Sequence, residues 1–441
     1  MRLTIEKLIY GGDGLARLPA DEHGRGKAVF IPFVLGGEKV EASITEEKPG
    51  FARAQAERIL EPSSLRIDPP CPYFQRCGGC HYQHTTYEQQ LGIKAEILNE
   101  NLRRIAKLEL PSEPQIHSSL PWNYRNRTRL QLRADSAFAL GYFKMSSHEL
   151  LPIEQCPISS PLINRAIGVL WQLGRAGQVP STLREIELFC NAEDSRLQVE
   201  VYVNPREDKG RRTAAAQAFA EQLHKSLPEV ENIYVFAQTA VSARALPRAT
   251  SEELDWANVS RDFLYRTNSA SFRVSGGSFF QINRYLIDKL VSLVTNNRSG
   301  ELALDLYAGV GLFTPSLAAS FRHTFAVESS QSSTADLKYN VPPGVKAVRS
   351  TVDEFLSTKG AKLRPDLVVV DPPRAALGER VVGNLIKLAA PRLTYVSCDP
   401  ATLARDMIHL LAGGYRVEQV HLVDLFPQTY HIESIVQLIR S

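Results

Sequence analysis

The last third of the chain shows short apolar runs that alternate with helical stretches. The runs LALDL at 302–306, LVVV at 367–370 and LTYV at 393–396 are too short for helices and are followed by turn residues. Buried parallel strands read as continuous apolar runs of this kind, and the helices between them cover both faces of the sheet. We therefore assign residues 269–441 to the α/β fold class and predict a Rossmann-like, doubly wound sheet.

The start of the chain has a different pattern, with short apolar runs between tight-turn signals. KAVFIPFV at 27–34 and EKVEASITEE at 38–47 read as strands separated by paired glycines. This spacing is typical of a small β barrel of the oligonucleotide-binding type, and equally of a solubilising β domain. We predict such a barrel at residues 1–62 and a central α+β domain at 63–268.

Composition sets limits on the chain but does not identify a function. The 441 residues carry 51 basic and 48 acidic side chains, so any surface that binds nucleic acid must be a local patch. No stretch approaches the roughly 18 uninterrupted apolar residues of a membrane span, and the first residues lack the pattern of a secretory signal. We expect a cytoplasmic monomer without membrane contact.

A strand, a glycine turn and the start of a helix follow one another in LDLYAGVGLFTPSLA. Asp305 closes the strand, and Gly309 and Gly311 allow backbone to approach a ligand closely. Glu328 ends the next strand, where a carboxylate can accept hydrogen bonds from ribose hydroxyls. A turn needed only for packing, a nicotinamide site and an adenosylmethionine site all fit this pattern. Thr314 stands where a dinucleotide site would have its third glycine, which favours adenosylmethionine.

Further candidate residues lie at the ends of later strands. Asp371 follows LVVV and precedes two prolines, a common way to present a planar substrate beside a methyl donor. Cys398 stands at a strand-to-turn junction, where a thiol is placed to react, although an inert buried cysteine also fits. A thiolate added to C6 of uracil makes C5 nucleophilic, and a base must later remove the C5 proton. We predict Cys398 as nucleophile and Glu433 as base, with His431 as the rival base.

Four cysteines form a candidate metal site. Cys71, Cys77 and Cys80 lie close together around a pair of glycines, and Cys156 precedes a proline far along the chain. Four thiolates suit either an iron–sulfur cluster or zinc. The gap of five residues between the first two cysteines exceeds the usual zinc spacing, and a Cys-Pro pair often accompanies iron–sulfur ligation. We therefore favour a 4Fe-4S cluster over zinc.

One predicted strand carries a row of arginines. In YRNRTRLQLR, Arg125, Arg127, Arg129 and Arg133 alternate with other residues, so that they share one face of the strand. Such a face can follow a phosphate backbone or stack on splayed bases. A solvated strand face is the simpler interpretation, and both stay open at this point.

Together these residues resemble the RNA uracil-C5 methyltransferase family, specifically its iron–sulfur branch acting on 23S ribosomal RNA. Motifs of the family occur in the expected order: CPYFQRCGGCHYQH, YRNRTR, FFQIN, DLYAGVG, DPPR, SCDP and FPQTYHIES. The resemblance implies an N-terminal RNA-binding TRAM domain, an adenosylmethionine cofactor and a target uridine flipped out of its loop. It implies Cys398 as nucleophile, Glu433 as base, the four cysteines as cluster ligands, and cofactor contacts from Gln281, Tyr307, Glu328, Thr351 and Asp371.

The sequence departs from the family pattern at three positions. Ala376 stands where the family usually has glycine two residues after the arginine of DPPR, which puts the path of that loop in question. Ala308 replaces a cysteine of many relatives, and Leu312 replaces a polar residue of some.

Three other functions compete with this interpretation. A catalytically silent RNA-binding or assembly factor has no need of Cys398 and Glu433, and a nicotinamide-dependent oxidoreductase gives no role to DPPR or the thiol. A uracil-C5 methyltransferase of transfer RNA has the same chemistry. Bacterial members of that branch lack the barrel and the cluster, so the resemblance favours ribosomal RNA.

Overall fold

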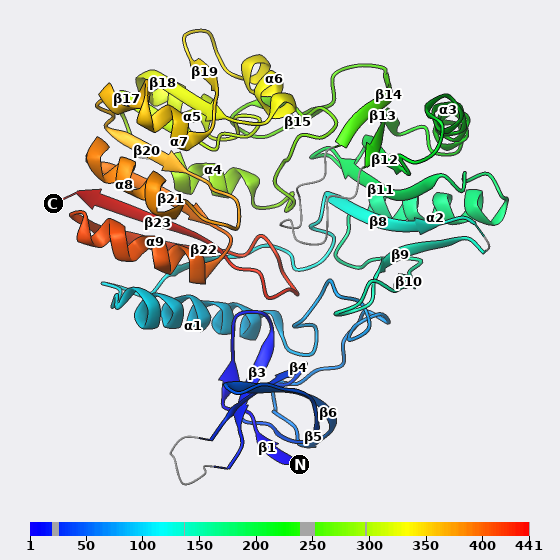
Figure 1. The fold of residues 1–441 in the computed structure, drawn as a ribbon, viewed down its shortest axis with the longest axis horizontal. Coiled ribbons are helices and arrows are strands. Elements are labelled where there is room, and N and C mark those ends of the chain that lie inside the picture. Colours follow the sequence, from blue (N-terminus) through cyan, green and yellow to red (C-terminus); the bar gives the residue numbers. More distant parts are fainter. Residues whose placement is uncertain (20–25, 136, 239–251, 296–297, 441) are drawn as a thin grey trace.

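The computed structural model describes residues 1–19, 26–135, 137–238, 252–295 and 298–440. Three large sheets of six, seven and eight strands follow one another along the chain, and a two-stranded pair lies between the second and third (Figure 1). Among the described residues, no helix has both the length and the apolarity needed to cross a membrane.

The first sheet is a small barrel-like unit with its own core. Buried residues alternate along its strands, as in the pattern of Val29 and Ile31 or of Val40 and Ala42, and these side chains meet in one cluster. Both apolar runs that the sequence predicted as strands are strands here. The sheet order is β1-β5-β6-β4-β3-β2, with bounds β1 (Arg2–Thr4), β2 (Lys7–Leu8), β3 (Asp13–Arg17), β4 (Ala28–Pro32), β5 (Lys39–Glu47) and β6 (Phe51–Glu61).

The second sheet forms the middle of the molecule, and two helices pack against it. Its order is β10-β9-β8-β11-β12-β13-β14, and α2 and α3 contribute buried leucine, isoleucine and phenylalanine side chains to its core. The bounds are β8 (Arg127–Arg133), β9 (Ala139–Phe143), β10 (Leu150–Pro152), α2 (Pro161–Arg175), β11 (Leu183–Cys190), β12 (Leu197–Val203), α3 (Lys209–Ser226), β13 (Val230–Gln238) and β14 (Glu252–Val259). The two-stranded pair that follows consists of β15 (Leu264–Arg266) and β16 (Ser271–Arg273).

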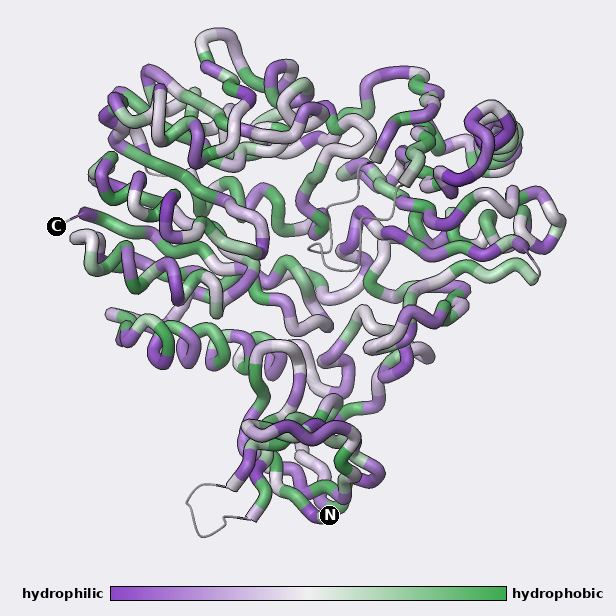
Figure 2. Tube along the Cα trace, viewed as in Figure 1, coloured by the Kyte–Doolittle hydropathy of each residue, from purple (hydrophilic) through white to green (hydrophobic). Residues whose placement is uncertain are grey.

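The third sheet has the predicted α/β architecture. Its order is β19-β18-β17-β20-β21-β23-β22-β7, and helices cover both faces in two separate cores. The strands β20 and β23 are hydrophobic over most of their length (Figure 2). The bounds are α4 (Ile287–Thr295), β17 (Gly300–Leu306), α5 (Thr314–Ser320), β18 (Phe321–Glu328), α6 (Gln331–Asn340), β19 (Lys346–Arg349), α7 (Val352–Ser357), η1 (Gly360–Lys362), β20 (Leu367–Val370), α8 (Gly378–Leu388), β21 (Arg392–Ser397), α9 (Pro400–Ala412), β22 (Tyr415–Val423) and β23 (Glu433–Arg440).

The sheet is not wholly parallel, which differs from the prediction. The strands β17 to β21 run parallel, whereas β23 runs antiparallel to both β21 and β22. The physical reason is the connection, because residues 424–432 join β22 and β23 as a hairpin without a crossover helix.

Two elements from the predicted central segment pack on the third sheet. The helix α1 (Tyr87–Ala106) lies against α9, and β7 (Gln115–His117) pairs in parallel with β22. At their junction Lys94 Nζ lies 2.6 Å from Asp424 Oδ1, and both side chains are fully buried. The domain boundaries at residues 62 and 268 stay predictions, but α1 and β7 belong by packing to the last sheet.

Candidate active site

The pairing of β21 with β23 brings the two predicted catalytic residues together. Ser397 is the register partner of Ser434 in this antiparallel pair, and the Ser434 hydroxyl donates to the Ser397 carbonyl at 3.2 Å. Cys398 follows Ser397, and Glu433 precedes Ser434, so Cys398 and Glu433 lie opposite each other just beyond the pair. Glu433 is buried and Cys398 is half-buried.

The turn that carries Cys398 is fixed by the helix that follows it. Asp399 is the N-cap of α9, and its Oδ1 accepts hydrogen bonds from the backbone N–H groups of Ala401 at 3.0 Å and Thr402 at 2.9 Å. Pro400 occupies the first helical position, where its missing N–H costs nothing. The sequence SCDP therefore specifies a strand end, a half-buried thiol at the turn and an immediate helix start.

Burial and neighbouring carboxylates keep Cys398 protonated in the free protein. Burial, followed by the charges of Glu433 and Asp371, raises the pKa of the Cys398 thiol to about 12, while Arg374 acts in the opposite direction. Burial and Asp371 likewise raise the pKa of Glu433 well above its usual range. Burial and Asp305 raise the pKa of Asp371 to about 7. Asp305, Asp371 and Glu433 thus form a series of interacting acidic groups near the thiol.

His431 is a neutral neighbour of the site and lies outside β23. The strand β23 begins at Glu433, two residues after His431. Burial, with Arg374 next, lowers the pKa of His431 to about 3. Its Nε2 lies 3.4 Å from Arg374 Nη2, and its ring contacts those of Phe426 and Tyr430.

Most of the predicted cofactor residues lie at one edge of the third sheet. Tyr307, Glu328 and Asp371 follow or end the parallel strands β17, β18 and β20, and Cys398 follows β21. The carboxyl ends of parallel strands are where α/β sheets bind their ligands. Gln281 is buried in the connection between β16 and α4, where its carbonyl accepts a hydrogen bond from Asn126.

The glycine turn after β17 has the geometry of a ligand-binding turn. Gly309 has φ of 57°, a side chain there would meet nothing within 4 Å, and its N–H donates to Glu328 Oε2 at 2.9 Å. Asp305 Oδ2 accepts from the Thr314 hydroxyl at 2.5 Å, while its buried Oδ1 has no hydrogen-bond partner among the described residues. Thr314, at the position where a dinucleotide site would have its third glycine, is therefore hydrogen-bonded to Asp305.

Two residues near this edge have clear structural roles. Thr351 is exposed and caps α7, because its Oγ1 accepts the Glu354 N–H at 3.2 Å. Ala376 has φ of 66°, a left-handed conformation that suits glycine better. The loop after DPPR therefore takes a left-handed turn at an alanine.

The four predicted metal-binding cysteines line one cavity of about 290 Å³. Arg125 lines the same cavity, and within the described ranges its buried Nε has no hydrogen-bond partner. In the part of the chain that the structure describes, no three His, Cys, Asp or Glu side chains are close enough together to hold a metal ion. The four thiols thus lie around one space.

The first three arginines of the row in YRNRTRLQLR contact other parts of the protein, which neither of the two open interpretations predicted. Arg127 pairs with Glu187 at 3.0 Å, and Arg129 lies over the Tyr202 ring at 3.5 Å. Because β8 lies between β9 and β11, acidic and aromatic side chains of neighbouring strands cover this face. Arg125 lines the cysteine cavity, and only Arg133 is exposed.

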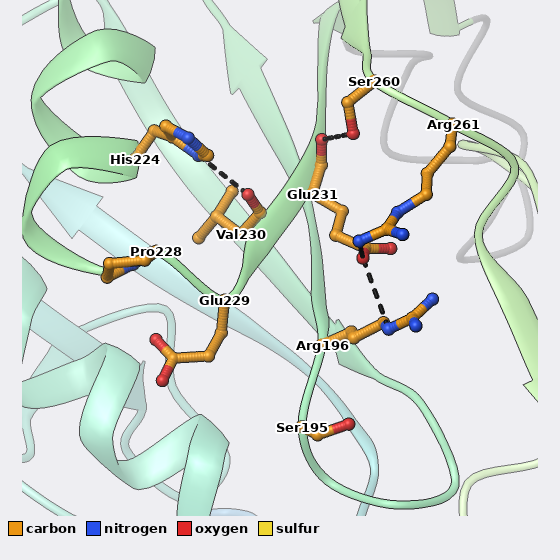
Figure 3. A pocket seen from close by; sticks show the side chains of 9 residues that line it. All are labelled: Ser195, Arg196, His224, Pro228, Glu229, Val230, Glu231, Ser260 and Arg261. Atoms are coloured by element: carbon orange, nitrogen blue, oxygen red, sulfur yellow. Dashed lines mark hydrogen bonds and ion pairs between the residues drawn. The ribbon is translucent and has the colours of Figure 1, made fainter.

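A second cavity, of about 350 Å³, lies at the edge of the central sheet (Figure 3). Arg196 and Arg261 both pair with Glu231 there, and His224 Nδ1 contacts the Val230 carbonyl at 2.9 Å. The charged side chains of this cavity pair with one another, and no thiol lines it. We therefore do not place the reaction there.

Comparison with known proteins agrees with this geometry. The family model for tRNA (uracil-5-)-methyltransferase matches residues 86–441, and the TRAM domain model matches residues 1–56. The chain belongs to this methyltransferase family. It is an adenosylmethionine-dependent RNA methyltransferase with an N-terminal TRAM domain.

Relatives and a solved structure cover the whole chain. A protein of Aquifex aeolicus is 32% identical, covering 99% of this chain and 98% of its own, and one of Streptomyces avermitilis is 32% identical, covering 99% and 97%. Both are described as uncharacterized RNA methyltransferases. The structure of Pyrococcus abyssi tRNA (uracil-54, C5)-methyltransferase with S-adenosyl-L-homocysteine has a TM-score of 0.74 at 23% identity, covering 100% of both chains. The shared fold therefore includes the barrel.

Sequence reasoning missed two residues that this methyltransferase places beside Cys398. The Tyr10 hydroxyl donates to the Cys398 carbonyl at 3.2 Å, and Arg374 acts electrostatically on the thiol. The prolines and the aspartate of DPPR were used as signals. Its arginine, a cation at the same strand end, is the signal that could have predicted Arg374. Tyr10 gave no signal, because 388 positions separate it from Cys398.

Alkylation should reveal the protonated state of Cys398. Because its pKa lies near 12, the thiolate fraction rises with pH, and iodoacetamide should modify Cys398 about tenfold faster per pH unit from roughly pH 7 to 10. At neutral pH, modification should be at least about a hundredfold slower than in the denatured protein, whose thiols have a pKa near 8.5. Mass spectrometry of the peptide would measure both rates. A native profile that levels off near or below pH 8.5 would contradict this electrostatic account.

Proposed function

We propose that this methyltransferase forms 5-methyluridine in 23S ribosomal RNA, with Cys398 as nucleophile and Glu433 as base. The observation that carries the proposal is the register of β21 and β23, which sets the thiol opposite a buried carboxylate. The choice of ribosomal RNA rests on the resemblance to the iron–sulfur branch. The shared fold does not decide it, since a transfer RNA enzyme has the same fold over its full length.

The proposed reaction uses the chain's own groups in two stages. Cys398 Sγ first loses its proton to solvent and then, as thiolate, adds to C6 of the uracil ring, and the displaced pair of electrons moves through C5 to the O4 enolate. Adenosylmethionine, when bound, supplies the methyl group that C5 takes up. Glu433 then accepts the C5 proton, and the C6–S bond breaks to release Cys398 as thiolate. A raised pKa makes the ionised Glu433 a stronger base than an ordinary carboxylate.

The residues at the sheet edge fit adenosylmethionine. Glu328 is held by backbone N–H groups and can accept ribose hydroxyls, and the open turn at Gly309 lets a ligand approach the backbone. Asp305 offers a buried oxygen without a partner. We assign Tyr307, Glu328 and Asp371 to the cofactor, with Gln281 and Thr351 as further contacts implied by the family.

We further propose that Cys71, Cys77, Cys80 and Cys156 hold a 4Fe-4S cluster. The support is one cavity lined by all four thiols, the donors that such a cluster takes. The positively charged guanidinium of Arg125 lines the same cavity and would partly compensate the negative charge of a thiolate-bound cluster. The cluster would join the segment after the barrel to the central domain.

The central test is methyl transfer. Labelled methyl groups from adenosylmethionine should enter unmodified 23S ribosomal RNA but not unmodified transfer RNA, and nuclease digestion with mass spectrometry should give 5-methyluridine. Cys398→Ala should give no product because the ring is no longer activated at C5. Label in transfer RNA alone would overturn the substrate. No label in either, with retained cofactor binding, would favour the silent RNA-binding function.

The role of Glu433 predicts a trapped intermediate. Glu433→Gln removes the base but leaves the nucleophile, so a protein–RNA adduct that survives denaturation should accumulate while turnover falls by about 10²–10⁴-fold. Gel electrophoresis of the adduct is the measurement. The double variant Cys398→Ala/Glu433→Gln should form none. Absence of an adduct in the single variant would point to His431 or water as the base.

Replacing one cluster ligand should remove the metal. Protein purified without oxygen should be brown and contain iron, and Cys156→Ala should lose both the visible absorbance and the iron. Cys190→Ala is the matched control, because Cys190 is buried against Ser160 away from the cavity and should leave the iron content unchanged. A colourless wild-type protein that contains zinc would refute the cluster assignment.

A further inference from the structure

A turn of the barrel reaches the catalytic edge of the third sheet. Between β2 and β3, Gly12 N–H donates to the Ile9 carbonyl at 3.2 Å, which forms a tight turn with Tyr10 at its tip. The barrel lies below α1 and the loop that precedes β23 (Figure 1). From this turn the Tyr10 hydroxyl donates to the Cys398 carbonyl oxygen at 3.2 Å.

The Cys398 carbonyl lies outside the hydrogen-bond patterns of the strand before it and of the helix after it. β21 ends at Ser397, and the first carbonyl of the α9 hydrogen-bond series is that of Asp399, which accepts from Leu403 at 3.0 Å. Cys398 lies between the two elements, so its carbonyl belongs to neither the strand ladder nor the helix. A donor from another part of the chain therefore restricts the rotation of this peptide group and of the thiol attached beside it.

Aromatic packing fixes Tyr10 in place. Its ring meets Tyr430 edge-on, with centroids 5.5 Å apart at 88°, and Tyr430 in turn contacts His81 and His431. Beside it, a side chain at Gly12 would lie 3.0 Å from the His81 Cβ, so glycine allows the turn to approach this closely. Burial, followed by Asp399, raises the pKa of Tyr10, so that the hydroxyl stays a hydrogen-bond donor.

We propose that Tyr10 is a positioning residue that sets the orientation of Cys398 and connects the TRAM domain to the nucleophile. The proposal rests on the role of Cys398 proposed above. The competing explanation is that Tyr10 only helps to attach the barrel to the rest of the protein. Other polar contacts, however, also attach the barrel. Lys7 pairs with Glu100 of α1, and Glu38 Oε1 accepts from Arg66 Nε at 2.6 Å. Loss of one hydroxyl therefore leaves the barrel attached.

The test compares Tyr10→Phe with Lys7→Met in the full-length protein. Tyr10→Phe keeps the ring against Tyr430 and removes only the hydroxyl, whereas Lys7→Met removes a barrel contact away from Cys398. The probe is the transcript that accepts methyl groups, made with 5-fluorouridine in place of uridine. Fluorine at C5 cannot be removed by a base as the C5 proton is, so the covalent protein–RNA adduct persists. The readouts are the rate of adduct formation, kcat, the KM for RNA and the thermal unfolding midpoint.

We expect Tyr10→Phe to slow adduct formation and kcat by about 3- to 10-fold, the loss of one hydrogen bond, with KM and the midpoint unchanged. Lys7→Met should form adduct at the wild-type rate. A wild-type rate for Tyr10→Phe, equal slowing in both variants, or a change in KM alone would each overturn the proposal. Cys398→Ala, run in parallel, separates the two hypotheses. Its inactivity keeps the nucleophile assignment whatever Tyr10→Phe does, and its activity overturns both.

Discussion

The antiparallel pairing of β23 with β21 is the constraint on which the site depends. In a parallel sheet every strand presents its carboxyl end to the same edge, so the first residue of a parallel last strand would lie at the opposite edge from Cys398. Because β23 is reversed, its first residue, Glu433, reaches the edge where β21 ends. One reversed strand thus brings a thiol and a carboxylate together from separate parts of the chain.

The loop before β23 must be rigid for this placement to be useful, and buried polar contacts hold it. Lys94 of α1 pairs with Asp424 and donates to the Phe426 carbonyl at 2.9 Å. The amide of Gln90 donates to Gln428 Oε1 and accepts its backbone N–H, both at 3.0 Å. Removing Lys94 alone would leave a buried carboxylate without its cation, a loss of about 3–5 kcal/mol. The position of α1 on the third sheet is therefore part of the support of the catalytic edge.

The sequence was informative where local chemistry determines structure. Strand ends followed by glycine, Pro-Pro or Asp-Pro predicted the edge that carries Tyr307, Asp371 and Cys398, because each motif itself breaks the strand. Periodicity also predicted the strand character of β8 but not its surroundings, since alternation does not say which strand will cover a face. The reversal of β23 and the contact of Tyr10 could not be predicted, because both depend on the packing of distant segments.

The acidic groups below Cys398 impose an order on the reaction. Besides burial, Asp305 raises the pKa of Asp371, Asp371 raises that of Glu433, and both Glu433 and Asp371 raise that of the thiol. The free protein therefore keeps Cys398, the proposed nucleophile, protonated and unreactive toward adventitious electrophiles. Among the described side chains that act on Cys398, Arg374 is the one that lowers the thiol pKa, and it is exposed. The proposed attack on uracil therefore needs a contribution that lowers this pKa, and Arg374 is a cation in position to make it.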